Sequence, residues 1–130
     1  MTNIKFLAKQ DTNRKKILSG IHKIIIETDK NVKAEDGKMM GKEMILYKTD
    51  GIFKYGLSSV NQYMSLHLMP IYGSSKLHSK YENLLKQAKF QKGCINFRNE
   101  EEMPLEIVKH LISDCSKIDM KVLMQNWKRL

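Results

Sequence analysis

The sequence predicts an α+β domain in which helices cover one face of an antiparallel sheet of about four to five strands. From Tyr47 to Tyr72 the chain forms short runs rich in aromatic residues, broken by Gly and Ser, which is typical of a meander of strands. On either side of this region apolar residues recur at the three- and four-residue spacing of amphipathic helices. The expected order is helix, three strands, helix, strand, helix.

The first helix is expected to begin at Asp11 or Thr12, whose side chains can cap free amide groups, and to end near Asn31. Its apolar residues share one face of the helix: Ile17, Leu18, Ile21, Ile24 and Ile25. Residues 33–41 are polar and contain two glycines, so we expect a loop there.

The meander is expected to contain strands over residues 44–47, 52–55 and 63–69, with the Asp50-Gly51 dipeptide as the turn between the first two. In the third strand Met64, Leu66 and Leu68 alternate with more polar residues. Because successive side chains of a strand point to opposite faces, this apolar set should look into the core. Pro70 cannot donate to a ladder and closes the strand.

The second half of the chain predicts two more helices and one strand. Ser74 or Ser75 can cap a helix whose apolar stripe is Leu77, Tyr81, Leu84, Leu85 and Ala88. Residues 94–97 alternate as a strand, and Pro104 suits the first position of the last helix. Residues 118–130 repeat helical spacing, either as a continuation of that helix or as a separate short one.

Size and composition indicate one domain over residues 1–130, with a core of about 13–117 and a helical tail over 118–130. Cys94 and Cys115 are too few for a disulfide framework and are expected to be reduced and partly buried. No run of residues resembles a signal peptide or approaches the roughly 20 apolar residues of a membrane span. We therefore expect a cytoplasmic protein with no membrane attachment, as a monomer or a homodimer.

The chain is basic, with 23 Lys and Arg against 14 Asp and Glu and a net charge of +9. Such a surface attracts phosphate polymers. The candidate nucleic-acid residues lie on the first predicted helix: Arg14, Lys15, Lys16 and Lys23. Interleaved carboxylates break up any cationic stripe, so a solvated basic surface is the preferred interpretation and a nucleic-acid-associated module the alternative.

Motifs of catalysis and metal binding are missing from the sequence. No two of the four histidines have the i, i+4 spacing of a helical metal site, and there is no Gly-rich phosphate loop or Ser-centred elbow. The chain is therefore read as a non-enzymatic protein. Carboxylate oxygens bind hard cations, which makes two short acidic runs the metal candidates: Glu35 and Asp36, and Glu100, Glu101 and Glu102.

Aromatic residues concentrate on the meander and allow three interpretations. Buried, they are core; exposed beside lysines, they can stack bases. The third interpretation is a pocket between sheet and helices that suits a small anionic or aromatic ligand. Its candidate residues are Tyr55, Tyr63, His67 and Tyr72.

Four segments in this order resemble the YdhG-like family of small bacterial domains of unknown function. They are Tyr55-Gly56-Leu57, residues 64–70 (MSLHLMP), residues 92–97 (KGCINF) and residues 104–108 (PLEIV), and the resemblance covers roughly residues 13–117. It implies a frataxin-like α+β fold and, because a member of the wider family has been proposed as an iron chaperone, a link to iron handling. The preferred reading is thus a protein that binds a small ligand or a protein partner through the meander, with iron as the implied cofactor.

Overall fold

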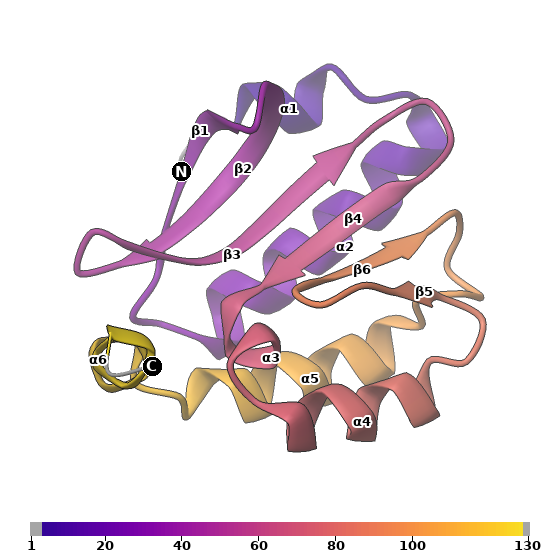
Figure 1. The fold of residues 1–130 in the computed structure, drawn as a ribbon. Helices are drawn as coiled ribbons and strands as arrows, with labels where there is room; N and C mark the ends of the chain where they lie inside the picture. Colours follow the sequence, from indigo (N-terminus) through magenta and orange to yellow (C-terminus); the bar gives the residue numbers. More distant parts are fainter. Residues whose placement is uncertain (1–3, 129–130) are drawn as a thin grey trace.

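The computed structural model describes residues 4–128, and within them the chain folds into one six-stranded antiparallel sheet with helices packed against it (Figure 1). The strands follow the order β1-β2-β3-β4-β6-β5. The α+β class predicted above is confirmed, but the sheet has six strands rather than four to five. The strands are β1 (Lys33–Met39), β2 (Lys42–Thr49), β3 (Ile52–Ser59), β4 (Met64–Leu68), β5 (Lys89–Phe90) and β6 (Cys94–Phe97).

The helices described by the structure are of two kinds. Three of them carry the predicted apolar stripes: α2 (Thr12–Thr28), α4 (Ser75–Leu84) and α5 (Leu105–Ser116). The other three are short: α1 (Lys5–Ala8), α3 (Met69–Tyr72) and α6 (Met120–Lys128). A four-residue helix is too short to show a helical period, which explains why α1 and α3 were not predicted. The tail forms the separate short helix α6.

The additional edge strand β1 corrects the prediction of a loop over residues 33–41. It pairs with β2 from Lys33 opposite Lys48 to Met39 opposite Lys42. Charged residues are common on edge strands, where they oppose pairing with other chains, so this strand lacks the alternation that marks a half-buried one. Met40 and Gly41 make the hairpin turn with φ of 53° and 79°, the backbone form that such two-residue turns require.

The core lies between the sheet and the helices α2, α5 and α4; in Figure 1, α2 lies behind the sheet, and α5 and α4 lie below it. Met64, Leu66 and Leu68 of β4 are fully buried there, so the predicted inward face of this strand is confirmed. From the helices, Leu18, Ile21 and Leu111 are likewise fully buried. Each such side chain contributes about 1.5 to 3 kcal/mol on burial, which makes this layer the main source of stability.

Helix ends follow the predicted capping residues closely. The Asp11 side chain accepts a hydrogen bond of 2.9 Å from the Arg14 amide at the start of α2. Ser74 accepts one of 3.2 Å from the Leu77 amide at the start of α4. Helix α5 begins one residue later than predicted: Pro104 is its N-cap, and Leu105 is its first helical residue.

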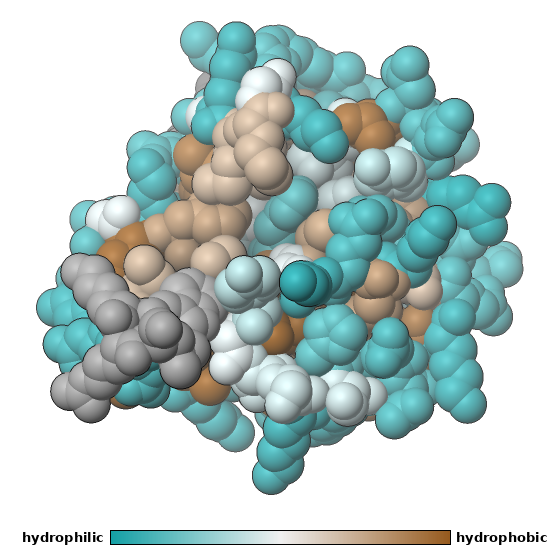
Figure 2. All heavy atoms as spheres, viewed as in Figure 1, coloured by the Kyte–Doolittle hydropathy of each residue, from teal (hydrophilic) through white to brown (hydrophobic). Residues whose placement is uncertain are grey.

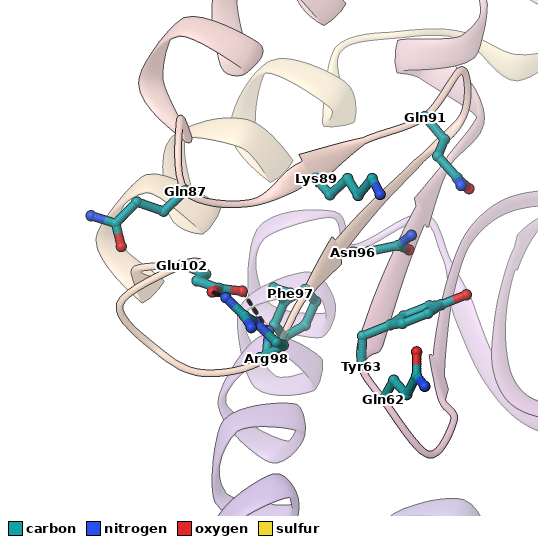
Figure 3. Close-up of a pocket in the computed structure, with 9 residues that line it drawn as sticks. All are labelled: Gln62, Tyr63, Gln87, Lys89, Gln91, Asn96, Phe97, Arg98 and Glu102. Atoms are coloured by element: carbon teal, nitrogen blue, oxygen red, sulfur yellow. Dashed lines mark hydrogen bonds and ion pairs between the residues drawn. The ribbon is translucent and has the colours of Figure 1, made fainter.

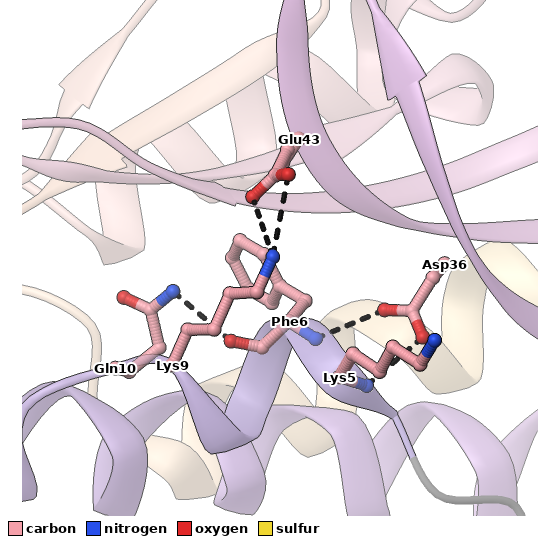
Figure 4. A network of polar contacts seen from close by, with 6 residues as sticks. All are labelled: Lys5, Phe6, Lys9, Gln10, Asp36 and Glu43. Atoms are coloured by element: carbon pink, nitrogen blue, oxygen red, sulfur yellow. Dashed lines mark hydrogen bonds and ion pairs between the residues drawn. The ribbon is translucent and has the colours of Figure 1, made fainter.

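The short helix α1 is tied to the sheet edge by polar contacts (Figure 4). Asp36 of β1 accepts hydrogen bonds from the backbone amides of Lys5 and Phe6, at 2.9 and 3.0 Å. The Lys9 ammonium lies 3.4 Å from both carboxylate oxygens of Glu43 on β2. The Asp36 carboxylate therefore serves as the cap of α1.

A buried polar cluster joins three elements at the other end of the sheet. The Lys54 ammonium lies 2.8 Å from Asp29 Oδ2 and donates to the Ile118 carbonyl at 3.1 Å. The Tyr55 hydroxyl donates to the same Asp29 oxygen at 2.8 Å. Asp29 and Lys54 are 1% and 2% exposed, so this cluster links the end of α2, strand β3 and the turn before α6 inside the protein.

Both thiols are free, in keeping with the reduced state expected from the sequence. Cys115 is fully buried, and burial raises its pKa to about 12. Cys94 is half-buried, and burial also raises its pKa. Among residues 4–128, no helix combines the length and the apolar character that crossing a membrane requires.

Candidate functional site

The face of the sheet opposite the helices, called the outer face here, carries side chains in two rows across the strands. Residues paired directly across neighbouring strands point to the same face and lie about 5 Å apart, so each row is contiguous. The first row is Met44, Ser58, Ser65, Asn96 and Lys89. The second is Leu46, Gly56, His67 and Cys94.

The outer face is divided into an apolar and a polar part (Figure 2). Tan and brown side chains gather over β1 and β2, whereas teal ones predominate around β5 and β6. In the apolar part, the side chains of Met44 and Leu46 lie over glycines of the adjacent strands. A Cβ added at Gly56 would lie 2.5 Å from Met44 Cε, and one at Gly37 would lie 2.5 Å from Leu46 Cδ1.

In the polar part, hydrogen bonds across the strands hold the side chains in place. Ser65 Oγ donates to Asn96 Oδ1 at 2.5 Å, and Ser58 Oγ lies 3.2 Å from His67 Nε2. The amide nitrogen of Asn96 makes no hydrogen bond to another described residue. Asn96 thus presents a donor whose position is fixed by the bond to Ser65.

A polar groove of about 690 Å³ lies at this end of the outer face (Figure 3). Tyr63, Lys89, Gln91 and Asn96 extend toward the same space, whereas Arg98 and Glu102 pair with each other at the opposite side of the view. The volume falls within the range of small-ligand sites. The full lining is Gln62, Tyr63, Gln87, Lys89, Gln91, Asn96, Phe97, Arg98 and Glu102.

The electrostatics of the groove favour an anion. Glu102 is the only acid of the lining, and its carboxylate accepts from Arg98 Nη2 at 2.7 Å and from Arg98 Nε at 3.0 Å. The Arg98 side chain lowers the pKa of Glu102, so this carboxylate is ionised and paired. Lys89 has no ion pair among residues 4–128, so the lining as a whole has an excess of positive charge.

Beside the groove, His67 is expected to titrate below the ordinary imidazole pKa of 6.5, because burial and then the charge of Lys42 lower its pKa. The unfolded chain therefore takes up the proton first as the pH falls. The stability that neutral His67 contributes is fully present above pH 6.5. It is lost as the pH falls from 6.5 through the pKa that His67 has in the folded protein.

An NMR titration of the His67 ring checks this expectation. The midpoint should lie below 6.5, and Lys42→Gln should move it upward. A midpoint at or above 6.5 in the native protein would contradict the assigned burial and the position of Lys42.

Of the four residues predicted to line a pocket, the structure brings two to the outer face. Tyr63 lines the groove, and His67, four residues further along the chain on β4, points to the same face. Tyr55 is fully buried on the opposite face, and burial, Cys115 and Asp29 raise its pKa, so it is a core residue. Tyr72 is 53% exposed and lies against Gly93 in the turn before β6, outside the lining.

Seven residues of the lining were not predicted, and three of them extend into the groove beside Tyr63: Lys89, Gln91 and Asn96. Strand β5 has two residues, too few to show an alternation. For Asn96, a signal was present, because within residues 94–97 the apolar Ile95 and Phe97 alternate with Cys94 and Asn96. That alternation assigns Asn96 to the face away from the core.

The candidate metal ligands serve separate contacts. Glu35 pairs with Lys48 at 2.7 Å, Asp36 caps α1 and Glu102 pairs with Arg98, while Glu100 and Glu101 are exposed in the turn between β6 and α5. Within residues 4–128 there is no group of three or more His, Cys, Asp or Glu side chains that could hold a metal ion.

The candidate nucleic-acid residues on α2 fall into two groups, one that binds a loop of the protein and one that is exposed to solvent. Arg14 donates to Ser59 Oγ at 2.7 Å and to the carbonyls of Val60 and Asn61, so it anchors the loop between β3 and β4. Lys15, Lys16 and Lys23 are exposed on α2, on the opposite side of the sheet from Tyr63.

Together these observations define a class of protein, an α+β domain whose six-stranded antiparallel sheet has helices on one face and a cationic polar groove on the other. Comparison of the chain with protein-family models, with curated proteins and with solved structures finds no match. The resemblance to the YdhG-like family therefore stays a prediction.

Proposed function

We propose that this chain is a non-enzymatic cytoplasmic binding protein whose polar groove takes an anionic ligand with a planar ring, the chemistry of a nucleotide. The observation that carries the proposal is the convergence of Tyr63, Lys89, Gln91 and Asn96 on one open hollow. A half-exposed tyrosine offers a face for stacking, the amides offer hydrogen bonds to a ring edge, and the lysine offers a cation for phosphate.

A binding role fits the outer face better than catalysis does. Ser58 and His67 are within hydrogen-bond distance, which is the arrangement of an activated hydroxyl. Ser58, however, is 3% exposed, and no carboxylate among the described residues bonds the imidazole to orient it. The pair thus links β3 to β4 beneath the surface and offers a ligand no accessible nucleophile.

Iron delivery, which the YdhG-like resemblance implies, is not part of this proposal. Three of its five candidate carboxylates are held in three different places, by Lys48, by the α1 amides and by Arg98, and the other two, Glu100 and Glu101, are exposed in a turn. Hard cations are bound by several oxygens that converge on one point.

Calorimetric and NMR titration with uridine and adenosine monophosphates tests the proposal. Binding should move the amide signals of residues 62–63, 89–91 and 96. Tyr63→Ala should weaken it roughly 5- to 150-fold, the range of a lost stacking contact, while Tyr63→Phe should retain it. Tyr72→Ala is the matched control, since it removes an exposed tyrosine outside the lining. Absence of heat and of shifts at millimolar nucleotide would refute the proposal.

A further inference from the structure

We infer that the natural ligand of the polar groove is a single-stranded nucleic acid that crosses the outer face from Lys89 toward Lys42, rather than a free nucleotide. The inference rests on the proposed function and adds to it the polymer, its path and the second cation.

A strip of the outer face continues from the groove along the sheet. Lys89 and Lys42 are exposed at its ends, whereas Ser65, Ser58 and Met44 between them are 4%, 3% and 1% exposed and lie beneath the surface. From Lys89 the first row passes through Asn96, Ser65 and Ser58 to Met44, crossing four gaps between strands. With strands about 4.8 Å apart, this row spans roughly 19 Å, longer than one nucleotide needs. Lys42 precedes Met44 by two residues on β2 and so points to the same face.

Positive charge lies at both ends of the strip. Lys89 is at the β5 end and Lys42 at the β2 end, and the charge of Lys42 reaches both His67 and Cys94. The carboxylates on this side of the sheet are neutralised, because Glu102 pairs with Arg98, and Glu35, which lies opposite Leu46 on the outer face, pairs with Lys48. Two separated cations with no opposing acid suit successive phosphates of one chain.

Tyr63 lies between the two cations, because it directly precedes β4, the strand in the middle of the row. Single strands expose their bases for stacking on aromatic side chains, whereas a duplex keeps them paired and stacked. The α2 lysines lie on the opposite side of the sheet from Tyr63, so they cannot contact the phosphates of a nucleic-acid strand whose bases stack on Tyr63. The structure thus assigns the interface to the outer face instead of to α2.

Fluorescence anisotropy with a labelled oligouridylate of about 12 nucleotides tests the inference, a length within the range of single-strand sites. A duplex of equal length and uridine monophosphate serve as competitors. We expect the oligonucleotide to bind at least about 10-fold more tightly than the mononucleotide and to resist competition by the duplex.

A salt series on matched lysine variants locates the interface. Lys42→Gln and Lys89→Gln should each reduce the slope of log affinity against log salt by roughly 0.7, the value of one phosphate contact on a single strand. Lys16→Gln, an equal change of charge on exposed α2, should leave the slope unchanged. Circular dichroism of each variant confirms that the fold is intact.

Three results would overturn the inference. If the mononucleotide binds as tightly as the oligomer with the same salt slope, the polymer is excluded while the proposed function stands. If neither binds, both fail. If Lys16→Gln lowers the slope as much as Lys42→Gln does, the nucleic acid contacts α2 and the outer face is the wrong surface.

Discussion

Replacing Lys54 with Met is expected to lower the free energy of unfolding by about 3 to 5 kcal/mol, the usual cost of removing one partner of a buried ion pair. The change leaves the Asp29 carboxylate, which is 1% exposed, with the Tyr55 hydroxyl but without a countercharge. It also removes the donor to the Ile118 carbonyl before α6. Urea unfolding followed by circular dichroism measures the effect.

Two control variants make this result specific to the buried pair. Lys48→Met removes an exposed partner of Glu35 and should change stability by no more than about 1 kcal/mol. In the double variant Asp29→Leu with Lys54→Met, no charge remains buried, and much of the lost stability should return. A loss below about 1 kcal/mol for Lys54→Met alone would show that Asp29 reaches water.

Leu66→Ala is expected to lower the free energy of unfolding by about 2 to 5 kcal/mol, because it leaves a cavity in the middle of the core. Leu66 is fully buried on β4 and pairs with Leu57 on one side and Ile95 on the other. Denaturant unfolding should show a lower midpoint at an unchanged slope.

Leu84→Ala is the matched control for Leu66→Ala. The same side chain is removed, but Leu84 is 51% exposed at the end of α4, and its loss should change stability by about 0.5 kcal/mol or less. Equal effects of the two variants would mean that the inward face of β4 has been assigned wrongly.

Local pattern was sufficient for most of the fold. The stripe of isoleucines on α2, the alternation of Met64, Leu66 and Leu68 and the caps at Asp11 and Ser74 each report on neighbours within a few residues, and the structure confirms them. The edge strand β1 was not predicted because its charged residues are hydrated at the exposed edge of the sheet. Its sequence therefore lacks the alternation of apolar and polar residues that indicates a strand.

The candidate site was predictable only in part. Tyr63 was identified as an aromatic residue on the meander, and His67 was placed on the same face of the predicted strand as Tyr63. Tyr55 was misassigned because its partner Asp29 is 26 residues away, and only the folded chain places both beside Lys54.

The alternation of side chains along each strand decides which residues point away from the core, since it follows from backbone geometry alone. It does not decide which of those residues meet. Tyr63 and Lys89 share a groove because β6 pairs with β4 on one side and with β5 on the other. That choice of partners depends on packing of the whole sheet against α2 and α5, which distant parts of the chain supply together.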